Sequence, residues 1–385
     1  MRTGTPSFQP SRLKAAREAR CMTGAALAEL VGVTRSSISQ YERAEQTPSP
    51  MVLNRLSNVL NLPGQYFCST PLNIDAPVFY RSFSTALKRS RIRAERRLEW
   101  LQEIVVYLSE MMEFPNLELP SVDLPSDILE LSLEDVEDVA KVVRRDWGLS
   151  DGPISNLVRL VENNGLIVTR HFLDTEKLDA FSCMKTAFHR PVIVLSMDKE
   201  CSVRSRYNLA HELGHVILHR QVDQASLKNR NSFKRIELQA HRFAGAFLLP
   251  ATTFLRELFS PSLDAFLAQK ERWGVSVAMM VKRCEDLGVV NEELARRLWR
   301  NLARRGWRKH EPLDDTIAIE KPMLLQRSFD LLLQSDEMCR EGILRDLPWS
   351  SAEIESLAGL TAGTLDTESG EDASAEPRII RFPSA

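Results

Sequence analysis

The feature that most constrains this chain is a segment in which two histidines and a glutamate stand among apolar residues. His211 and His215 are four positions apart, so on a helix they share one face, and Glu212 lies beside them. The flanking positions are apolar at helical spacing, which predicts a buried helix over residues 207–219. Three buried polar side chains need partners, and a divalent metal ion would satisfy them. The alternative is a pair of hydrogen-bonded core histidines without a metal.

A hydrolytic zinc site needs a third protein ligand and one open position. Glu237 is the best candidate, because it lies far enough beyond His215 for a loop and an antiparallel helix to intervene. His241, one turn after Glu237, and His219, one turn after His215, are the rival ligands. Glu212 is predicted to be the general base rather than a ligand, because it can take a proton from the attacking water. We therefore predict one zinc ion, with Mn²⁺ as the alternative.

Short amphipathic segments separated by turn signals fill the first 70 residues. Gly32 suits a tight turn between two crossing helices. Ser11 is placed to cap the first helix, and Thr34 is placed to cap the third. Four helices are predicted, from residue 13 and over residues 24–30, 35–44 and 51–60. That order is a helix-turn-helix.

The third of these helices is predicted to bury Ile38 and Tyr41 and to present a polar face to a major groove. Glutamine can pair with adenine, arginine with guanine, and serine with either base. Residues 1–70 contain eight basic and four acidic side chains, a balance of +4, whereas the whole chain has a formal charge of −2. The predicted contacts to double-stranded DNA are Thr34, Arg35, Ser36, Ser37, Ser39, Gln40 and Arg43. The alternative is a helix-turn-helix that serves only dimerisation or a protein partner.

A basic stretch followed by an apolar stripe occupies a long helix predicted over residues 84–112. It could be an arm that lies on DNA phosphates, or a helix with a solvated face that packs on the next domain. The basic residues are Arg81, Lys88, Arg89, Arg91, Arg93, Arg96 and Arg97, and the apolar ones are Leu98, Leu101, Ile104, Val105 and Leu108.

Composition excludes several other classes of protein. No apolar run approaches the roughly 20 residues of a membrane span, and the N-terminus has no signal-peptide core. The 6 cysteines form no CxxC pair, which favours a reducing cytoplasm and argues against a disulfide framework. At 385 residues the chain allows several domains. We predict a mainly α protein with a small β-sheet (α+β) and no membrane contact.

Four regions follow from these patterns. They are a helix-turn-helix domain at 1–70, a linker helix region at 71–125, a metallopeptidase-like domain at 126–290 and a helical region at 291–385. The last region carries no motif that suggests chemistry, and residues 364–376 have the composition of a disordered tail. Residues 377–383 form a short extended segment that could add to a sheet edge.

Two stretches resemble known families. LAELVGVTRSSISQYERAEQTPSPMVLNRLSNVLNLP resembles the Xre and phage-repressor helix-turn-helix family, with Ala44 where the family often has glycine. RYNLAHELGHVILH followed by ELQAHRFAGAFLLP resembles the ImmA/IrrE family of bacterial metallo-endopeptidases, over about residues 146–290. The second resemblance implies zinc at His211, His215 and Glu237, with Glu212 as general base. It implies a zincin-like fold and a target among transcriptional repressors.

These resemblances lead to three functional hypotheses. The first is a DNA-binding endopeptidase that cleaves a repressor and so derepresses stress or mobile-element genes, acting as a homodimer. The second is a repressor-like or antitoxin-like transcription factor whose peptidase-like domain senses a ligand or partner without cutting. The third is a peptidase whose helix-turn-helix only docks its substrate. A peptidase also needs a donor for the oxyanion, and Arg206, Tyr207 and His189 are candidates near the motif.

Overall fold

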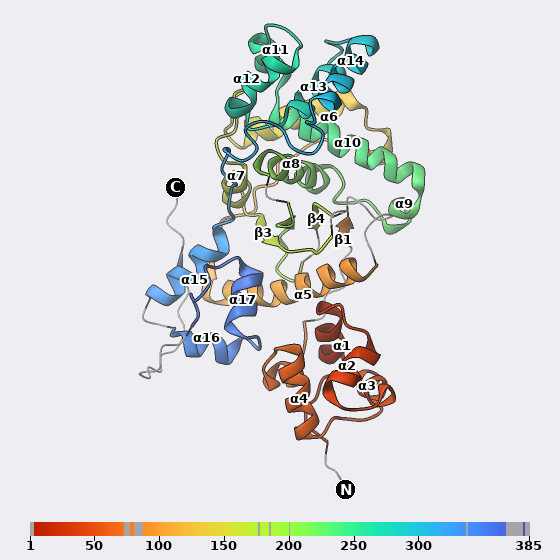
Figure 1. Ribbon diagram of the computed structural model, residues 1–385. Coiled ribbons are helices and arrows are strands. Elements are labelled where there is room, and N and C mark those ends of the chain that lie inside the picture. The colour runs from red at the N-terminus through yellow and green to blue at the C-terminus, as the bar shows by residue number, and fades with distance from the viewer. Residues whose placement is uncertain are drawn as a thin grey trace.

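The computed structural model describes residues 4–72, 78–80, 88–175, 178–184, 186–199, 201–335, 338–366 and 380–381. The chain is mostly helical with a small mixed sheet, which confirms the predicted fold class (Figure 1). In these ranges no helix has both the length and the apolar character that crossing a membrane requires. Much of the predicted tail, residues 367–376, lies outside the described part of the chain.

The N-terminal helices confirm the predicted helix-turn-helix order. Gly32 ends the second helix at φ 70°, and the Thr34 hydroxyl accepts a hydrogen bond from the Ser37 N–H at the start of the third. The predicted cap at Ser11 is wrong: the first helix begins at Pro10, because proline is favoured in the first turn, and Gln9 precedes it without a side-chain cap. The elements are α1 (Pro10–Ala19), α2 (Gly24–Val31), α3 (Arg35–Glu42), α4 (Pro50–Leu60) and the 3-10 turn η1 (Gly64–Cys68).

The end of α3 places a non-glycine residue in the left-handed region. Ala44 has φ 61°, two residues after the helix ends at Glu42. Ala44→Gly should raise the free energy of unfolding by about 1 kcal/mol, because glycine adopts this conformation without the Cβ clash. Thermal or denaturant unfolding of the full chain measures the effect. The control is Ala25→Gly, in the exposed part of α2, which should lower stability by about 1 kcal/mol. Destabilisation by Ala44→Gly would contradict the argument.

A four-stranded mixed sheet in the order β1-β4-β5-β3 lies at the centre of the domain that follows the helix-turn-helix. The central pair, β4 and β5, is antiparallel, and β3 runs parallel to β5. Side chains alternate between the two faces: Phe181 and Cys183 pack with α5 (Lys88–Met111) and the N-terminal helices, whereas Ala180 faces the core that holds α8 (Ser202–Leu218). The strands are β1 (Val78–Tyr80), β3 (Ile167–His171), β4 (Ala180–Cys183) and β5 (Val192–Ser196). The strand predicted at 191–195 is confirmed.

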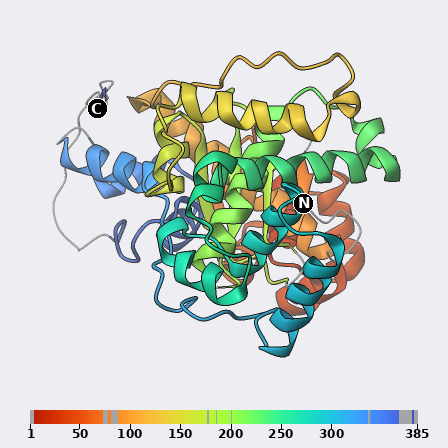
Figure 2. The same ribbon diagram turned by 90° about the horizontal axis from the view of Figure 1, so that it is seen from above.

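Helices cover both faces of this sheet (Figures 1 and 2). One hydrophobic core joins the helix-turn-helix, α5, α15–α17 and one face of the sheet, and a second core joins the other face to α6–α8 and α10–α14. The helices are α5 (Lys88–Met111), α6 (Leu133–Asp146), α7 (Leu157–Asn163), α8 (Ser202–Leu218), α9 (Gln224–Lys228), α10 (Arg230–Leu248), α11 (Ala251–Glu257), α12 (Leu263–Trp273), α13 (Val277–Asp286), α14 (Glu292–Arg304), α15 (Leu324–Gln334), α16 (Arg340–Asp346) and α17 (Ser351–Ala358), with the 3-10 turn η2 (Ile128–Glu130). A two-residue strand β2 (Met112–Glu113) pairs in parallel with β6 (Ile380–Arg381), so the predicted extended segment does add to a strand.

The long helix α5 packs as a structural element rather than projecting as an arm. Its predicted apolar stripe is buried, from Leu98 to Leu108. Its arginines pair within the protein: Arg97 Nη1 lies 2.7 Å from Glu353 Oε1 of α17, and Arg93 pairs with Asp174. These contacts favour the packing helix over the phosphate-binding arm. Arg81 lies outside the described residues.

The C-terminal helix α17 contacts three other parts of the fold. Glu353 also accepts from Arg20 Nη2 of the helix-turn-helix at 2.6 Å. The Leu357 carbonyl accepts a hydrogen bond from the Thr169 hydroxyl of β3 at 3.1 Å. One short helix therefore bonds to the helix-turn-helix, to α5 and to the sheet.

Candidate metal centre

The candidate metal centre lies between α8 and α10, which pack closely on one another. Small residues make this approach possible: a Cβ added at Gly214 would lie 3.3 Å from the Ala240 backbone and 3.1 Å from the Phe243 ring. Gly245 of α10 is not part of this contact: a Cβ added there would lie 3.8 Å from Arg283 Cδ. The close crossing brings a carboxylate of α10 opposite the two histidines of α8.

The structure brings His211, His215 and Glu237 together. Their ligand atoms all lie within 4.8 Å of one another. The two Nε2 atoms are 3.1 Å apart, and the Glu237 oxygens lie 3.7 Å from His211 Nε2 and 3.3 Å from His215 Nε2. Ligands on a tetrahedral zinc at bonds of about 2.0–2.1 Å are separated by about 3.3 Å. The three side chains therefore fit the donor set and the spacing of a zinc ion.

A chain of hydrogen bonds fixes the protonation of His215. Gln239 is fully buried, and its amide nitrogen lies 2.7 Å from the Ile128 carbonyl and 3.1 Å from the Leu131 carbonyl, so it donates both protons there. Its Oε1 must then accept from His219 Nε2–H, at 3.0 Å. Burial lowers the pKa of His219 to about 3, so the ring is neutral and its Nδ1 accepts from His215 Nδ1–H at 3.0 Å. In the neutral form of His215 the proton is then on Nδ1, and Nε2, which lies 3.3 Å from Glu237 Oε1, is the nitrogen that can bind a metal ion.

This chain leads to a test of metal affinity. Gln239→Met should lower the affinity of the protein for zinc by about 10-fold or more, because such supporting hydrogen bonds orient a ligating imidazole. Competition with a chromogenic zinc chelator measures the affinity without any substrate. Leu238→Ala, at an exposed neighbouring position, is the control and should leave the affinity unchanged. If Gln239→Met and the unmodified protein bind zinc with equal affinity, the hydrogen bonds from Gln239 through His219 do not support His215 as a ligand.

Glu212 is fully buried beside the metal ligands and is held by the sheet. Its Oε2 accepts a hydrogen bond of 2.7 Å from the Ser182 hydroxyl of β4. A carboxylate that is buried and anchored in this way has a defined orientation. The arrangement is suited to proton transfer at the metal centre.

The structure separates the three candidate oxyanion donors. Tyr207 lies on the same side of α8 as His211, with ring centroids 6.4 Å apart, and its hydroxyl lies 2.6 Å from His241 Nδ1. Arg206 is buried and bonds to Glu320 and to the Ile154 carbonyl, away from this side. His189 is exposed in the loop between β4 and β5. Tyr207 is thus the candidate nearest to the metal ligands.

The predicted DNA-contacting residues lie together on α3 and its flanks. Arg35, Ser36 and Arg43 are exposed, and the remaining serines and Gln40 are half-buried. Arg43 pairs with Glu45 at 3.1 Å. Ile38 and Tyr41 face the core, as predicted. In Figure 1 this helix lies at the far side of α5 from the metal centre.

Comparison with known families agrees with the geometry. The model of the IrrE N-terminal-like domain matches residues 161–285, and a helix-turn-helix model matches residues 13–67. The chain contains an IrrE N-terminal-like domain and a helix-turn-helix DNA-binding domain. The IrrE N-terminal-like domain is metallopeptidase-like and includes all of His211, His215 and Glu237. Comparison with curated proteins found no match.

Two residues that support the candidate metal centre, Gln239 and Ser182, were not predicted from the sequence. Gln239 is a polar residue on the apolar stripe of α10, between Ile236 and Phe243, and that interruption was the available signal. Ser182 has no such signal, because it reaches Glu212 through the pairing of β4 in the sheet. His219 and His241, the rival ligands, instead bond to Gln239 and Tyr207.

Proposed function

We propose that this protein is a zinc-dependent endopeptidase that cleaves a transcriptional repressor and also binds DNA. The observation that carries the proposal is the convergence of two imidazole nitrogens and the Glu237 carboxylate, with Glu212 beside them. The hydrogen-bonded chain to Gln239 leaves His215 Nε2 available as a ligand. A pair of core histidines would not need a converging carboxylate. This arrangement supports catalysis over a merely structural role.

Zinc held by His211, His215 and Glu237 would acidify the attacking water and polarise the peptide carbonyl. Glu212 accepts the proton of that water and then delivers it to the leaving amine. The Ser182 hydroxyl keeps the Glu212 carboxylate in position through this transfer. The Tyr207 hydroxyl would donate a hydrogen bond to the oxyanion that develops on the carbonyl oxygen and would keep its proton.

The DNA-binding half of the proposal rests on the exposed face of α3. The residues proposed to contact an operator are Thr34, Arg35, Ser36, Ser37, Ser39, Gln40 and Arg43. The hydroxyl of Thr34 also caps α3. Such domains bind paired half-sites, so we propose a homodimer on double-stranded DNA. Affinity for an operator should fall steeply with salt, because phosphate contacts release counterions.

Metal analysis and cleavage together test the proposal. Purified full-length protein should contain one zinc ion per chain and should cleave repressor-type proteins, and a chelator should abolish cleavage. Zinc should restore it, and Mn²⁺ is the alternative ion. A protein that binds zinc and operator DNA yet cleaves none of a panel of repressors would be the non-cleaving regulator. A protein that cleaves but lacks salt-dependent operator binding would use the helix-turn-helix to dock its substrate.

A further inference from the structure

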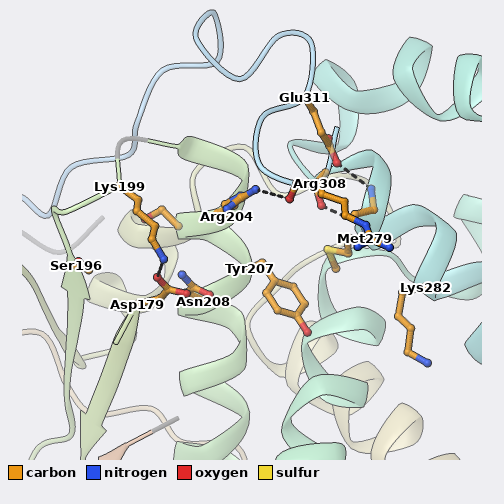
Figure 3. Close-up of a pocket in the computed structure, with 13 residues that line it drawn as sticks. Asp179, Ser196, Lys199, Arg204, Tyr207, Asn208, Met279, Lys282, Arg308 and Glu311 are labelled. Carbon is orange, nitrogen blue, oxygen red and sulfur yellow. Dashed lines mark hydrogen bonds and ion pairs between the residues drawn. The ribbon is translucent and has the colours of Figure 1, made fainter. Parts of the chain in front are cut away.

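A charged pocket adjoins the candidate metal centre. Its volume is about 360 Å³, and it lies between the N-terminal half of α8, α13, the ends of β4 and β5, and the loop that contains Arg308 (Figure 3). Tyr207 lines the pocket and contacts His241, whose ring lies 4.4 Å from that of His211. Tyr207 and His241 therefore link the pocket to the candidate metal centre.

The helix α8 sets the distance from the pocket to the reacting bond. Arg204 and Asn208 line the pocket and lie on the same face of α8 as His211. Arg204 precedes His211 by about two turns, or roughly 10 Å along the helix axis. An extended peptide advances about 3.3 Å per residue. A substrate side chain that reaches Arg204 would thus belong to a residue about three positions from the cleaved bond.

Most charges that line the pocket already have a partner of opposite sign. Asp179 pairs with Lys199 at 2.8 Å, and Lys282 pairs with Asp286 of its own helix at 2.9 Å. Glu311 accepts from buried Lys270 at 2.9 Å. Each of these three pairs contains one positive and one negative side chain, so the three pairs together have no net charge.

Two arginines remain. Arg204 donates through Nη2 to the backbone carbonyls of Arg308 and Lys309, which are neutral acceptors (Figure 3). Arg308 is exposed and lines the same pocket. In the described part of the chain, neither guanidinium forms an ion pair with a carboxylate. The six charged residues that line the pocket therefore sum to +2, the charge of Arg204 and Arg308, and Asp314, which shares Lys270 with Glu311, adds one negative charge behind the loop.

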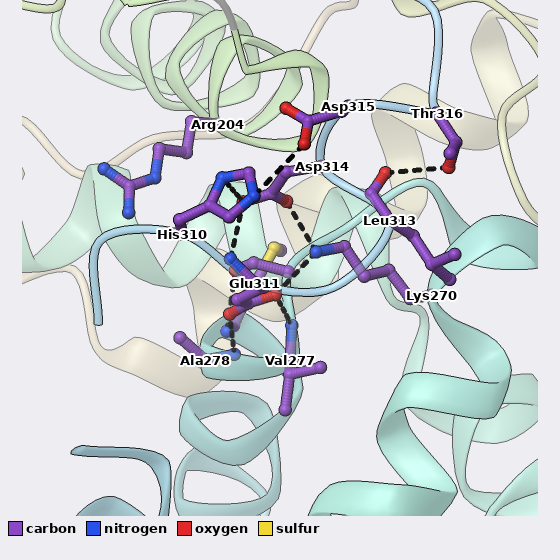
Figure 4. A network of polar contacts seen from close by, with 12 residues as sticks. Arg204, Lys270, Val277, Ala278, His310, Glu311, Leu313, Asp314, Asp315 and Thr316 are labelled. Carbon is purple, nitrogen blue, oxygen red and sulfur yellow. Dashed lines mark hydrogen bonds and ion pairs between the residues drawn. The ribbon is translucent and has the colours of Figure 1, made fainter. Parts of the chain in front are cut away.

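A buried network holds the loop that carries Arg308 (Figure 4). Lys270 is fully buried and donates to Glu311 and, at 2.6 Å, to Asp314. Glu311 also accepts from the Val277 N–H at the start of α13, at 2.8 Å. The backbone next to Arg308 is thereby fixed against α13, and Arg204 is fixed against that backbone. The Arg204 guanidinium is thus held at the pocket before any ligand arrives, and the backbone of Arg308 is fixed beside it.

We propose that Arg204 and Arg308 form a subsite that binds a carboxylate side chain of the substrate, about three residues from the cleaved bond. The inference rests on the proposed peptidase function and specifies its substrate class, an acidic peptide segment. An arginine binds a carboxylate through paired charge-assisted hydrogen bonds. A glutamine in the peptide has the same length as glutamate but no charge, so it cannot form this pair. Arg204 and Arg308 are specificity-determining residues and have no part in proton transfer.

Cleavage of a randomised decapeptide library by the zinc-loaded full-length chain tests the proposal. Mass spectrometry of the products should show aspartate and glutamate enriched two to four residues from the cut. On a matched peptide pair with glutamate or glutamine at that position, Arg308→Gln should lower kcat/KM about 10-fold for the first and leave the second unchanged. Arg297→Gln, at an exposed position of α14, is the control and should affect neither. Cuts without acidic enrichment, or an equal effect of Arg308→Gln on both peptides, would overturn the subsite.

A binding measurement separates failure of the subsite from failure of the peptidase. Fluorescence anisotropy of the same labelled peptide pair is measured with the full-length Glu212→Gln chain, which does not require cleavage. The glutamate peptide should bind about 10-fold more tightly, and Arg308→Gln in the same chain should abolish the difference while Arg297→Gln retains it. Preserved discrimination in this assay, together with no cleavage of either peptide by the unmodified zinc-loaded chain, would refute the peptidase and retain the subsite. Equal binding of the two peptides would refute the subsite.

Discussion

Glu212→Gln should lower the rate of peptide cleavage by about 10²–10⁴-fold, while the protein still binds one zinc ion. The amide has nearly the shape of the carboxylate and can still accept from the Ser182 hydroxyl, but it cannot take a proton from water. The three proposed ligands are unchanged, so zinc content should be retained. Single-turnover cleavage and metal analysis on the same preparation provide the two measurements.

Glu293→Gln is the matched control, because Glu293 is exposed on α14. It should leave both zinc content and cleavage unchanged. Undiminished cleavage by Glu212→Gln would remove Glu212 from the role of general base. Loss of zinc together with activity would instead indicate that Glu212 contributes to metal binding.

Lys270→Met should lower the free energy of unfolding by about 3–5 kcal/mol. The ammonium group is fully buried between Glu311 and Asp314, at 2.9 and 2.6 Å. Methionine fills a similar volume but leaves two buried carboxylates without their cation. Denaturant unfolding of the full-length chain, followed by near-UV circular dichroism, measures the loss.

Lys282→Met serves as the control, since Lys282 is exposed and pairs with Asp286 at the surface of α13, where an ion pair contributes about 1 kcal/mol or less. Adding Glu311→Gln and Asp314→Asn to Lys270→Met should recover part of the lost stability, because the uncompensated charges are then removed. A loss below about 1 kcal/mol for Lys270→Met would show that the network contributes little to stability.

Local patterns in the sequence predict the elements that local forces determine. The spacing of His211 and His215 indicates one helical face, and Gly32 and Thr34 mark the ends of helices that the structure confirms. Glu237 could be selected as a ligand because it lies on the next amphipathic segment at a distance that allows an antiparallel return. These predictions depend on periodicity and capping, which act over a few residues.

Contacts between distant segments could not be predicted in this way. Ser182 reaches Glu212 through strand pairing, and Glu311 reaches Lys270 through a loop that has no regular pattern. Strand β1 lies in a segment interpreted as linker, yet it pairs with β4 in antiparallel register. The wrong prediction at Ser11 has a local cause. Ser11 is a residue type that often precedes a helix, but Pro10, immediately before it, begins the first helix.

The carboxylate of Glu353 holds arginines from α1's C-terminal end and from α5, and the same helix bonds to β3. A premature stop codon or a proteolytic nick before α17 would therefore remove more than a peripheral appendage. It would uncover the shared core around α5 and weaken the attachment of the helix-turn-helix at the same time. Shortened forms of this protein should consequently lose both proposed activities, operator binding and peptide cleavage, so domain-by-domain dissection of these activities needs point substitutions in place of truncations.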